Sequence, residues 1–543
     1  MIKFYKKLDN KKRTIIFILA LTLLSSIPLF IFPGIKKGDD LYFHLSRISA
    51  ISDNIKNHQF FNGIYSEYFN GYGYANGLFY PDIFLYIPAL FKTIGINLIT
   101  SYKIFLIIIN FLSITSIYIT IKNISKNEHA SILGSIIYAF ASYRLVDIYE
   151  RAALGEAMSF IFIPIIIYGI YEIIYNDKKK FYILTIGMTC LILTHVLSTY
   201  IIGIVLLILC LINIKKLIKE KRILYLLLAA LTTLLLTSYF ILPMLEQMKS
   251  QTFYYSNTPN ISEFELSKRT VPPYLLFIEI PNLRKAIWKK YWVPSGIGII
   301  FIYLIYKKIK TKYQNQFINQ TYKISIISLI LTSITPFWKL EIVKKILFPL
   351  QFPWRLYMIP TVLLTISGSI LISKTTNTKK IIKNTFIVSM ISLISIFIIT
   401  LIPPRIKNIT EYEASYAEYL PKEVNKEYIK NRNIIITSNN ETKHTFQKKG
   451  TKIQIEFEQN DNDTDLELPL IYYKGYNASI NEKELEVYKT ENGLLGVKIK
   501  DIKSGTIKVS YKGTTLARIT KIISLISFII FTIYIIKEVK HEK

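Results

Sequence analysis

The sequence has very few of the residues that enzymes use for metal binding and for disulfide bonds. It holds two cysteines and six histidines in 543 residues, and neither type is spaced as in a zinc site or a disulfide framework. Both cysteines, Cys190 and Cys210, lie in apolar segments. The sequence also has no Walker A, dinucleotide-binding glycine, Gly-x-Ser-x-Gly or HExxH pattern. The common enzyme classes that carry these motifs are therefore excluded.

Acidic residues are scarce as well, since 37 Asp and Glu face 67 Lys and Arg, and the net charge is +30. Such a charge can indicate a nucleic-acid partner. Here the lysines cluster in short loops between apolar runs, as the positive-inside rule requires, so we predict no nucleic-acid partner. The chain is 51% hydrophobic with a mean hydropathy of +0.33. Apolar runs of nearly twenty residues recur along most of it, which predicts a polytopic α-helical membrane protein.

We predict about twelve spans, with both termini in the cytoplasm. The run 181–213 is too long for one span and has lysines on both flanks, so it must cross twice, with His195 at the outer tip. Without that second crossing, every later loop would face the other side. The predicted spans lie at about 14–32, 100–121, 129–143, 153–175, twice within 181–213, and at 223–243, 293–309, 321–337, 353–372, 381–402 and 518–536.

The spans divide the chain into three parts. Residues 1–402 form the membrane domain, and its long first outer loop, 34–99, contains two amphipathic stretches that suit interfacial helices, at about 41–58 and 79–95. Residues 403–516 are polar and lie outside the membrane, with a helical start and then alternating apolar residues that predict a small β-sandwich. Residues 517–543 are the last span and a basic cytoplasmic tail.

The stretch Gly38–Arg47 places two acids, a histidine and an arginine where the chain leaves the first span. If a helix continues from Leu41, Asp40, His44 and Arg47 fall at i, i+4 and i+7 and share one face. A simpler interpretation is an ordinary helix start, with Asp39 or Asp40 as the N-cap.

Ionisable residues other than lysine gather at the outer ends of the predicted helices, which predicts one polar cavity open to the outer leaflet. Simpler interpretations stay open: Arg355 snorkels, Glu150 and Arg151 form a surface pair, His195 satisfies a backbone carbonyl, and the aromatics of 60–86 form an interfacial belt. Glu156 is harder to dismiss, because its neighbours are apolar and a carboxylate there needs a partner. The cavity candidates are Asp39, Asp40, His44, Arg47, Tyr80, Asp82, Glu150, Arg151, Glu156, His195, Trp354 and Arg355.

The stretch Gly38–Ile48 resembles the opening Gly-x-Asp-Leu-x-Phe-His-Leu-x-Arg-Ile of bacterial membrane proteins labelled 6-pyruvoyl-tetrahydropterin synthase-related. The segment Leu468–Tyr476 resembles the tail domain of YfhO-like proteins. Looser matches are Asn70–Tyr74, Phe79–Asp82, Glu150–Glu156, Leu193–His195 and Phe352–Arg355. The six scattered histidines do not fit the zinc site of the soluble pterin enzyme.

The resemblance implies a GT-C glycosyltransferase architecture in the bacterial cytoplasmic membrane, with a catalytic aspartate in the first outer loop. It matches Asp40 to the recurrent acid and implies a polyprenyl-phosphate-linked sugar as donor and a cell-envelope polymer or lipid as acceptor, beside membrane lipid. We expect Asp40 to be the general base, with Asp39 and His44 beside it, and Arg47, Arg151 and Arg355 to bind the donor phosphate.

No cofactor is assigned, because paired acids permit Mg²⁺ or Mn²⁺ but no ligand set is visible. The alternatives are a transporter or flippase for a lipid-linked glycan and a non-catalytic envelope scaffold. A flippase needs a matching inner gate and no essential base, whereas the ionisable groups here are predicted on the outer side only.

Overall fold

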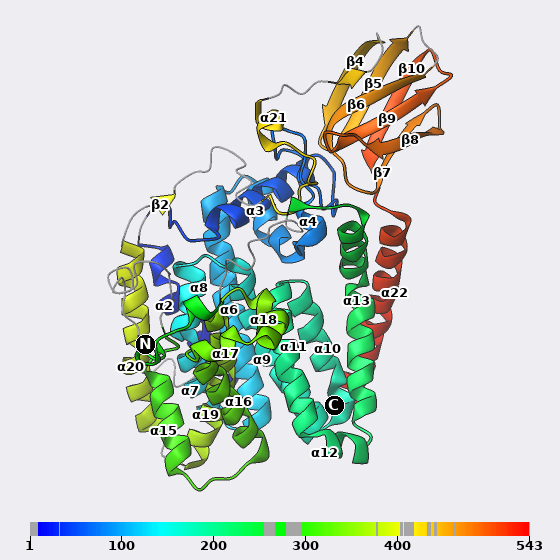
Figure 1. Cartoon of the computed structure of the whole chain (residues 1–543). Coiled ribbons are helices and arrows are strands. Elements are labelled where there is room, and N and C mark those ends of the chain that lie inside the picture. The colour runs from blue at the N-terminus through cyan, green and yellow to red at the C-terminus, as the bar shows by residue number, and fades with distance from the viewer. Residues whose placement is uncertain are drawn as a thin grey trace. The chain divides into compact units, whose positions relative to one another are not determined.

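The computed structural model forms two compact units (Figure 1). The helical unit comprises Met1–Leu41, Tyr102–Thr233 and Asn260–Asn408, and the mixed unit comprises Tyr42–Ser101, Leu234–Pro259 and Ile409–Lys543. The structure describes residues 9–31, 33–254, 266–278, 296–375, 378–401, 405–406, 417–431, 436–438, 442–459 and 463–541.

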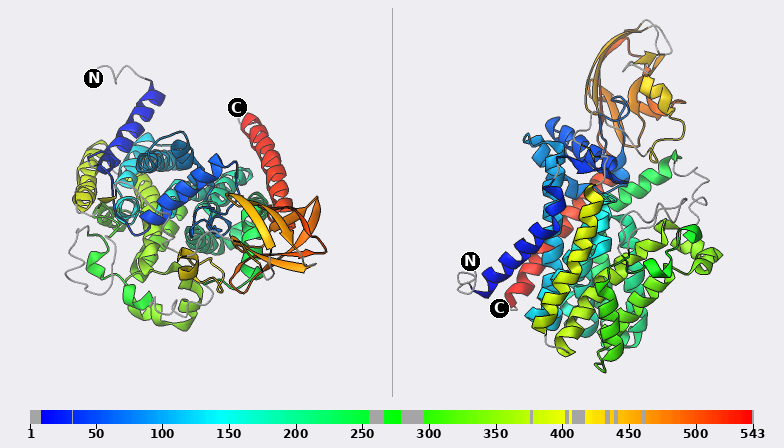
Figure 2. Two further views of the ribbon diagram at one scale, coloured as in Figure 1. Left: turned by 90° about the horizontal axis from the view of Figure 1, so that it is seen from above. Right: turned by 90° about the vertical axis from the view of Figure 1, so that its left-hand side faces the viewer.

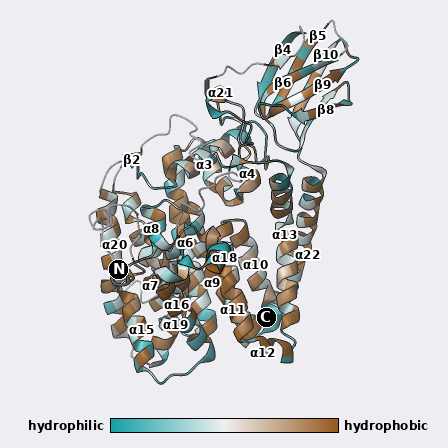
Figure 3. Cartoon of the chain, viewed as in Figure 1, coloured by the Kyte–Doolittle hydropathy of each residue, from teal (hydrophilic) through white to brown (hydrophobic). Residues whose placement is uncertain are grey.

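Long apolar helices make the chain a multi-pass membrane protein, as predicted. Within the described residues, six helices are long and apolar enough to cross a membrane, or seven if the bent pair α7 (Glu128–Ala139) and α8 (Ser142–Tyr149) is one span. Apolar residues run along these helices (Figure 3). The six are α6 (Leu98–Ser125), α9 (Leu154–Tyr175), α13 (Ile223–Ser250), the segment Pro353–Thr375 that contains η9 (Pro353–Tyr357) and α19 (Met358–Thr375), Ile381–Ile398 within α20 (Thr378–Leu401), and Thr515–Lys540 within α22 (Thr515–His541).

The count of twelve spans is not confirmed. Every other predicted span contains a helix, but these helices have fewer than 18 residues, and residues 293–295 of one span lie outside the described residues. At 1.5 Å per residue, such helices are shorter than the hydrocarbon layer of about 30 Å. The shorter helices are α2 (Asn10–Ser25), α10 (Phe181–Ile192), α11 (Val196–Ile212), α15 (Ile300–Lys310) and α16 (Gln316–Leu331).

The apolar run 181–213 is broken at His195, which is the N-cap of α11. Its two ends come together, since Lys178 Nζ donates a 2.7 Å hydrogen bond to the carbonyl oxygen of Glu220 and Arg222 Nη1 donates one of 3.0 Å to Asn176 O. The chain therefore reverses at His195, and the lysine-rich flanks of α10 and α11 lie on one side.

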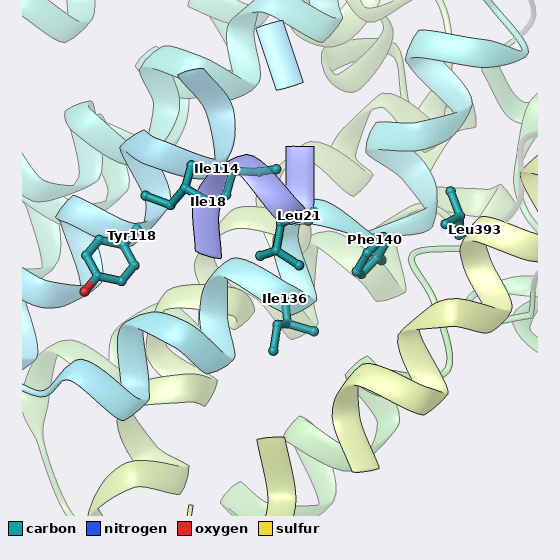
Figure 4. Packing of buried hydrophobic residues seen from close by; sticks show 8 residues of the cluster. Ile18, Leu21, Ile114, Tyr118, Ile136, Phe140 and Leu393 are labelled. Atoms are coloured by element: carbon teal, nitrogen blue, oxygen red, sulfur yellow. The ribbon is translucent and has the colours of Figure 1, made fainter. Parts of the chain in front are cut away.

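An apolar cluster joins four helices of the helical unit near the N-terminus (Figure 4). Ile18 and Leu21 of α2 pack with Ile114 of α6, Ile136 of α7 and Leu393 of α20, and all five side chains are buried. Burial of each such side chain contributes about 1.5–3 kcal/mol in water, but in a bilayer the close packing itself supplies most of the stabilisation.

In the mixed unit, the predicted amphipathic stretches form α3 (Leu41–Lys56), α4 (Asn76–Phe79), η2 (Ile83–Leu85) and α5 (Tyr86–Thr93). This segment packs on the C-terminal part of the unit. Ile471 N donates to Tyr72 O at 2.9 Å, and the Phe79 ring stacks on Tyr419 with 4.5 Å between centroids. Part of the predicted helical start, 407–416, lies outside the described residues, and the described part contains α21 (Lys426–Asn431).

The prediction of a β-sandwich is wrong, because the strands form one curved antiparallel sheet in the order β3-β6-β9-β8-β7-β10-β5-β4 (Figure 2). The strand β8 pairs with both β7 and β9. It therefore connects the strands β3, β6 and β9 with the strands β7, β10, β5 and β4 in one continuous sheet. Side chains of β5 alternate strictly between exposed and buried, as a sheet with one covered face requires. The strands are β3 (Thr437–Ser438), β4 (Thr442–Lys449), β5 (Lys452–Gln459), β6 (Asp463–Ile471), β7 (Tyr476–Ile480), β8 (Lys483–Lys489), β9 (Leu494–Lys500) and β10 (Ser504–Tyr511).

Candidate functional site

The loop between α8 and α9 carries the centre of the candidate site in the helical unit. Arg151 N donates to Val146 O at 2.9 Å, and Ala153 N donates to Asp147 O at 2.8 Å, so the chain folds back on the last turn of α8. Ala152, which lies between Arg151 and Ala153, has φ +54°, a left-handed conformation that is uncommon for a residue other than glycine. Such strain persists only where the surroundings hold it, and it often marks a functional site.

Arg151 is the cation of a buried ion network. Its Nη1 contacts the Asp147 carboxylate, which lies one helical turn earlier, and the Glu156 Oε2 at 2.9 Å, on the first turn of α9. Its guanidinium also lies over the Trp354 ring, 4.5 Å from the centroid. Arg151 is 3% exposed, Asp147 0% and Glu156 1%, so the two carboxylates and the guanidinium depend on one another for compensation.

A second cation reaches Glu156 from η9. Arg355 Nε lies 3.5 Å from Glu156 Oε2, and Arg355 Nη1 donates to Gln351 Oε1 at 2.7 Å. The Tyr143 hydroxyl donates to Glu156 Oε1. Glu156 thus has the partners that a buried carboxylate needs, and the network of two arginines and two acids carries no net charge.

The acid pair Asp39-Asp40 is fastened to the same loop. Asp40 N donates a 3.0 Å hydrogen bond to Arg151 O, and a Cβ on Gly38 would lie 2.8 Å from the Arg151 carbonyl oxygen and 2.7 Å from Ala152 Cβ. Only glycine allows this approach of the two backbones. The structure therefore brings Asp39 and Asp40 together with Arg151 within the helical unit.

The electrostatic surroundings of Asp39 are unusual for a carboxylate that reaches solvent. Packing around the side chain desolvates it and raises its pKa to about 6, and the neighbouring carboxylates of Asp40 and Glu150 act in the same direction, whereas Arg151 and Lys36 oppose them. Tyr102, at the start of α6, lies within electrostatic range of Asp40. Asp39, Asp40 and Glu150 thus form a group of nearby acids in which the pKa of Asp39 is raised.

His195 is the N-cap of α11. Its Nδ1 lies 2.7 Å from Ser198 Oγ and accepts a hydrogen bond from Ser198 N at 3.3 Å. The ring is also within electrostatic range of Glu156. The capping contact satisfies a backbone N–H at the start of α11, which is a structural role for His195.

The remaining predicted residues belong to the mixed unit. Arg47 is 1% exposed, its Nη2 donates to Pro81 O at 2.7 Å, and its guanidinium lies 4.4 Å from the centroid of the Tyr80 ring. Burial raises the pKa of Asp82 to about 6, and Arg47 opposes that rise. His44 is 2% exposed and packs on Phe43, with 5.1 Å between ring centroids. The contacts of Arg47 with Tyr80 and Pro81 hold the loop before α5 in place.

Asp147 belongs to the ionisable residues predicted at the outer ends of the helices, whereas Tyr143 and Tyr102 escaped prediction. Asp147 has a signal in the sequence, because it precedes Arg151 by four residues and α8 places them one turn apart. Tyr143 and Tyr102 have none, since tyrosines are common throughout the chain. In the described part of the chain, no three His, Cys, Asp or Glu side chains lie close enough to hold a metal ion.

No protein-family model matches the chain. An uncharacterized protein of Lactococcus lactis subsp. cremoris (strain MG1363) is 24% identical over 253 residues, which are 45% of this chain and 41% of that protein. Among solved structures, the chain is similar to ArnT from Cupriavidus metallidurans bound to undecaprenyl phosphate, with a TM-score of 0.43 and 11% identity over 71% of this chain and 63% of that one.

Each match covers less than two thirds of the other protein, and a TM-score this low does not establish a shared fold. The resemblance to pterin synthase-related and YfhO-like proteins therefore stays a prediction.

Proposed function

We propose that the protein is a membrane glycosyltransferase that transfers a sugar from a polyprenyl-phosphate-linked donor to a cell-envelope acceptor at the outer membrane surface. The observation that carries the proposal is the attachment of the Gly38–Asp40 turn to Arg151, beside the buried network of Asp147, Arg151, Glu156 and Arg355. A rigid platform under an acid pair is what general-base catalysis needs.

Asp40 is the general base in this proposal. It takes the proton of the acceptor hydroxyl as the hydroxyl oxygen attacks the anomeric carbon of the donor. The bond between that carbon and the phosphate oxygen breaks, and its electron pair stays on the lipid phosphate. One displacement of this kind inverts the anomeric configuration. Desolvation raises the pKa of the neighbouring Asp39, and the charges of Asp40 and Glu150 act in the same direction through like-charge repulsion.

The buried arginines have a positioning role in this proposal. Arg151 and Arg355 are already compensated by Asp147 and Glu156, at exposures of 3% and 6%. They hold the loop to which Asp40 is hydrogen-bonded. Their positive charges contribute to the electrostatic potential of the site, and they do not contact the donor directly. Arg47 and His44 are proposed to shape the first outer loop.

The test is transfer of radiolabelled sugar from a panel of polyprenyl-phosphate donors to an envelope fraction, in membranes that hold wild type or Asp40→Asn at matched expression. General-base assistance contributes about 10²–10⁴ in rate, so Asp40→Asn should lose nearly all transfer. The control is Asp177→Asn, because Asp177 accepts from Lys179 N through Oδ1 and asparagine retains that acceptor.

Equal transfer by wild type and Asp40→Asn would remove Asp40 as the base. If no donor supports transfer by the wild-type protein, the enzyme proposal is wrong, and a flippase for a lipid-linked glycan becomes the better interpretation.

A further inference from the structure

We propose that Arg518 and Lys521, near the start of α22 in the mixed unit, bind the phosphate of an anionic phospholipid. Both residues lie within Thr515–Lys540, a segment long and apolar enough to cross a membrane. A charged side chain in such a segment requires a partner, and the surroundings of the charge indicate its chemistry. Binding of this lipid is independent of the proposed sugar transfer.

The first turns of α22 lie at the surface of the membrane. Three residues separate the end of β10 at Tyr511 from the start of α22 at Thr515. A sheet with open edges does not enter the hydrocarbon layer, so the boundary between water and lipid falls at the beginning of the helix. Arg518 and Lys521 are the fourth and seventh residues of α22, about 4.5 and 9 Å along its axis from Thr515. This is the depth at which lipid phosphates are found.

The two cations share a face of α22 that differs from the face packed on α13. Ser524 Oγ lies 2.9 Å from Ser238 Oγ, so α22 lies beside the C-terminal half of α13 (Figure 1). On this packed face, Thr520 is 1% and Ser524 7% exposed. Arg518 and Lys521 are both exposed, and their spacing of i, i+3 places them side by side. Their face is rotated by about 110° from that of Thr520 and Ser524, and therefore points to lipid.

Neither cation has an acidic partner among the described residues. Arg518 Nη2 donates to the hydroxyl of the threonine at the helix start at 3.2 Å, which is a neutral contact. The acid that contacts the start of α22 is Glu246 of α13, and both of its oxygens are occupied. Its Oε1 lies 3.0 Å from Lys474 Nζ, and its Oε2 accepts from Thr514 Oγ1. The charges of Arg518 and Lys521 are therefore available to an anion from outside the chain.

Apolar side chains continue from the two cations toward the middle of the helix. Ile522 lies one turn beyond Arg518, and Leu525 one turn beyond Lys521, and Ile529 follows after another turn. Their exposed fractions are 59%, 60% and 50%. A phospholipid carries its phosphate directly above its acyl chains. With the phosphate on the cations, its chains would run along these three side chains, so the polarity of this helix face matches that of a lipid.

The charge of the pair favours an anionic lipid over a zwitterionic one. A phosphate between an arginine and a lysine forms charge-assisted hydrogen bonds, and the guanidinium matches phosphate geometry particularly well. The ammonium of a zwitterionic headgroup would bring a third positive charge beside them, whereas a glycerol headgroup adds none. In the predicted topology, α22 begins on the outer side, so the positive-inside rule does not account for these two cations.

The experiment measures the dissociation constants of dioctanoyl phosphatidylglycerol and dioctanoyl phosphatidylcholine for the purified full chain in detergent. Wild type should bind phosphatidylglycerol about tenfold more tightly than phosphatidylcholine. Each basic residue near an anionic lipid contributes about fivefold, so Arg518→Gln and Lys521→Gln should each weaken phosphatidylglycerol binding by about that factor. The double variant should lose about 25-fold.

Two control variants separate the charge from the rest of the side chain. Lys521→Arg keeps the cation and should bind phosphatidylglycerol within about twofold of wild type. Lys483→Gln, at an exposed lysine of β8, removes the same charge from the sheet and should change nothing.

Equal phosphatidylglycerol binding by wild type and the double variant would overturn the proposal. Equal binding of the two lipids by wild type would also overturn it, because the cations would then snorkel to any headgroup. Size-exclusion profiles identify a variant that has misfolded. If the double variant misfolds, the two single variants decide by the fivefold criterion.

Competition identifies the source of the phosphate. Farnesyl phosphate and inorganic phosphate are each added to wild type loaded with phosphatidylglycerol. If farnesyl phosphate displaces the phospholipid at a lower concentration than phosphatidylglycerol itself requires, the cations bind a polyprenyl phosphate and the phospholipid assignment is wrong. If inorganic phosphate does so, they bind free phosphate, and the assignment to a lipid is wrong. Retention of phosphatidylglycerol against both supports the proposal.

Discussion

The backbone N–H of Asp40 donates a 3.0 Å hydrogen bond to the carbonyl oxygen of Arg151. This hydrogen bond joins the backbones of two residues that lie more than a hundred positions apart in the sequence. The side chain of Arg151 points into a buried ion network, while its carbonyl holds the acid pair. A change in the network is therefore expected to move the acids, even though no side chain of the network needs to touch a substrate.

Gly38→Ala tests this attachment directly. The new Cβ would lie 2.8 Å from the backbone of Arg151, so the turn must move away and carry Asp40 with it. Displacement of a catalytic group by about 1 Å can cost roughly 10²-fold in rate, and we expect a loss of that order in sugar transfer. Gly203→Ala in α11 is the control, since a Cβ there meets nothing within 4 Å. Wild-type transfer by Gly38→Ala would contradict a role for the contact.

Glu156→Gln should destabilise the helical unit. The substitution leaves Arg151 and Arg355 buried with only Asp147 as counter-charge, and removal of one partner from a buried ion pair typically costs about 3–5 kcal/mol. We expect a clearly lower apparent melting temperature in detergent. Glu341→Gln, which breaks the exposed pair with Lys344, should leave the melting temperature nearly unchanged. Equal melting of Glu156→Gln and wild type would show that the network is not needed for stability.

The sequence predicts a membrane protein well, because the length of an apolar run can be read directly from the sequence, and this prediction is confirmed. The helix breaks are harder to read. Hydropathy does not mark the 44° bend between α7 and α8 or the end of α10 at Ile192. The count of twelve spans therefore stays a prediction, because among the described residues only six or seven helices reach membrane-spanning length.

The strands were also predictable from alternation, but their layering was not. Period-two patterning identifies which face of a strand is buried, whereas one sheet or two depends on which strands pair. The pairing of β8 with both of its sequence neighbours, β7 and β9, decides that, and the alternation within a strand does not record which strands it pairs with.

The site divides in a similar way. The need of Glu156 for partners follows from its apolar neighbours, and the Asp147–Arg151 pair follows from helical spacing. The attachment of Asp40 to Arg151 has no local signal, because these residues lie more than a hundred positions apart and meet only after folding.

Asp39 predicts a pH dependence of stability. Its pKa is raised from 3.8 to about 6 in the folded protein, so the folded state holds more protons than the unfolded state between these values. Stability from this group therefore falls as pH rises through that window. Asp39→Asn removes the effect, and its melting temperature relative to wild type should rise between pH 4 and pH 7, as measured in the same detergent.

Asp39→Glu keeps an ionisable carboxyl and should follow the wild-type trend. A constant difference between Asp39→Asn and wild type across this pH range would show that the folded environment does not raise the pKa of Asp39.

Gly496→Val tests the single curved sheet. Gly496 of β9 lies directly opposite Tyr488 of β8, and a Cβ at Gly496 would meet the Tyr488 ring at 2.5 Å. Valine favours strands, so any loss comes from displacement of the Tyr488 ring, which lies over Gly496. Hydrogen–deuterium exchange of the full chain should speed up in β8 and β9 and stay unchanged in α9. Lys508→Val, at an exposed position of β10, should leave β8 and β9 protected, and unchanged exchange in Gly496→Val would mean that β8 does not join the two halves of the sheet.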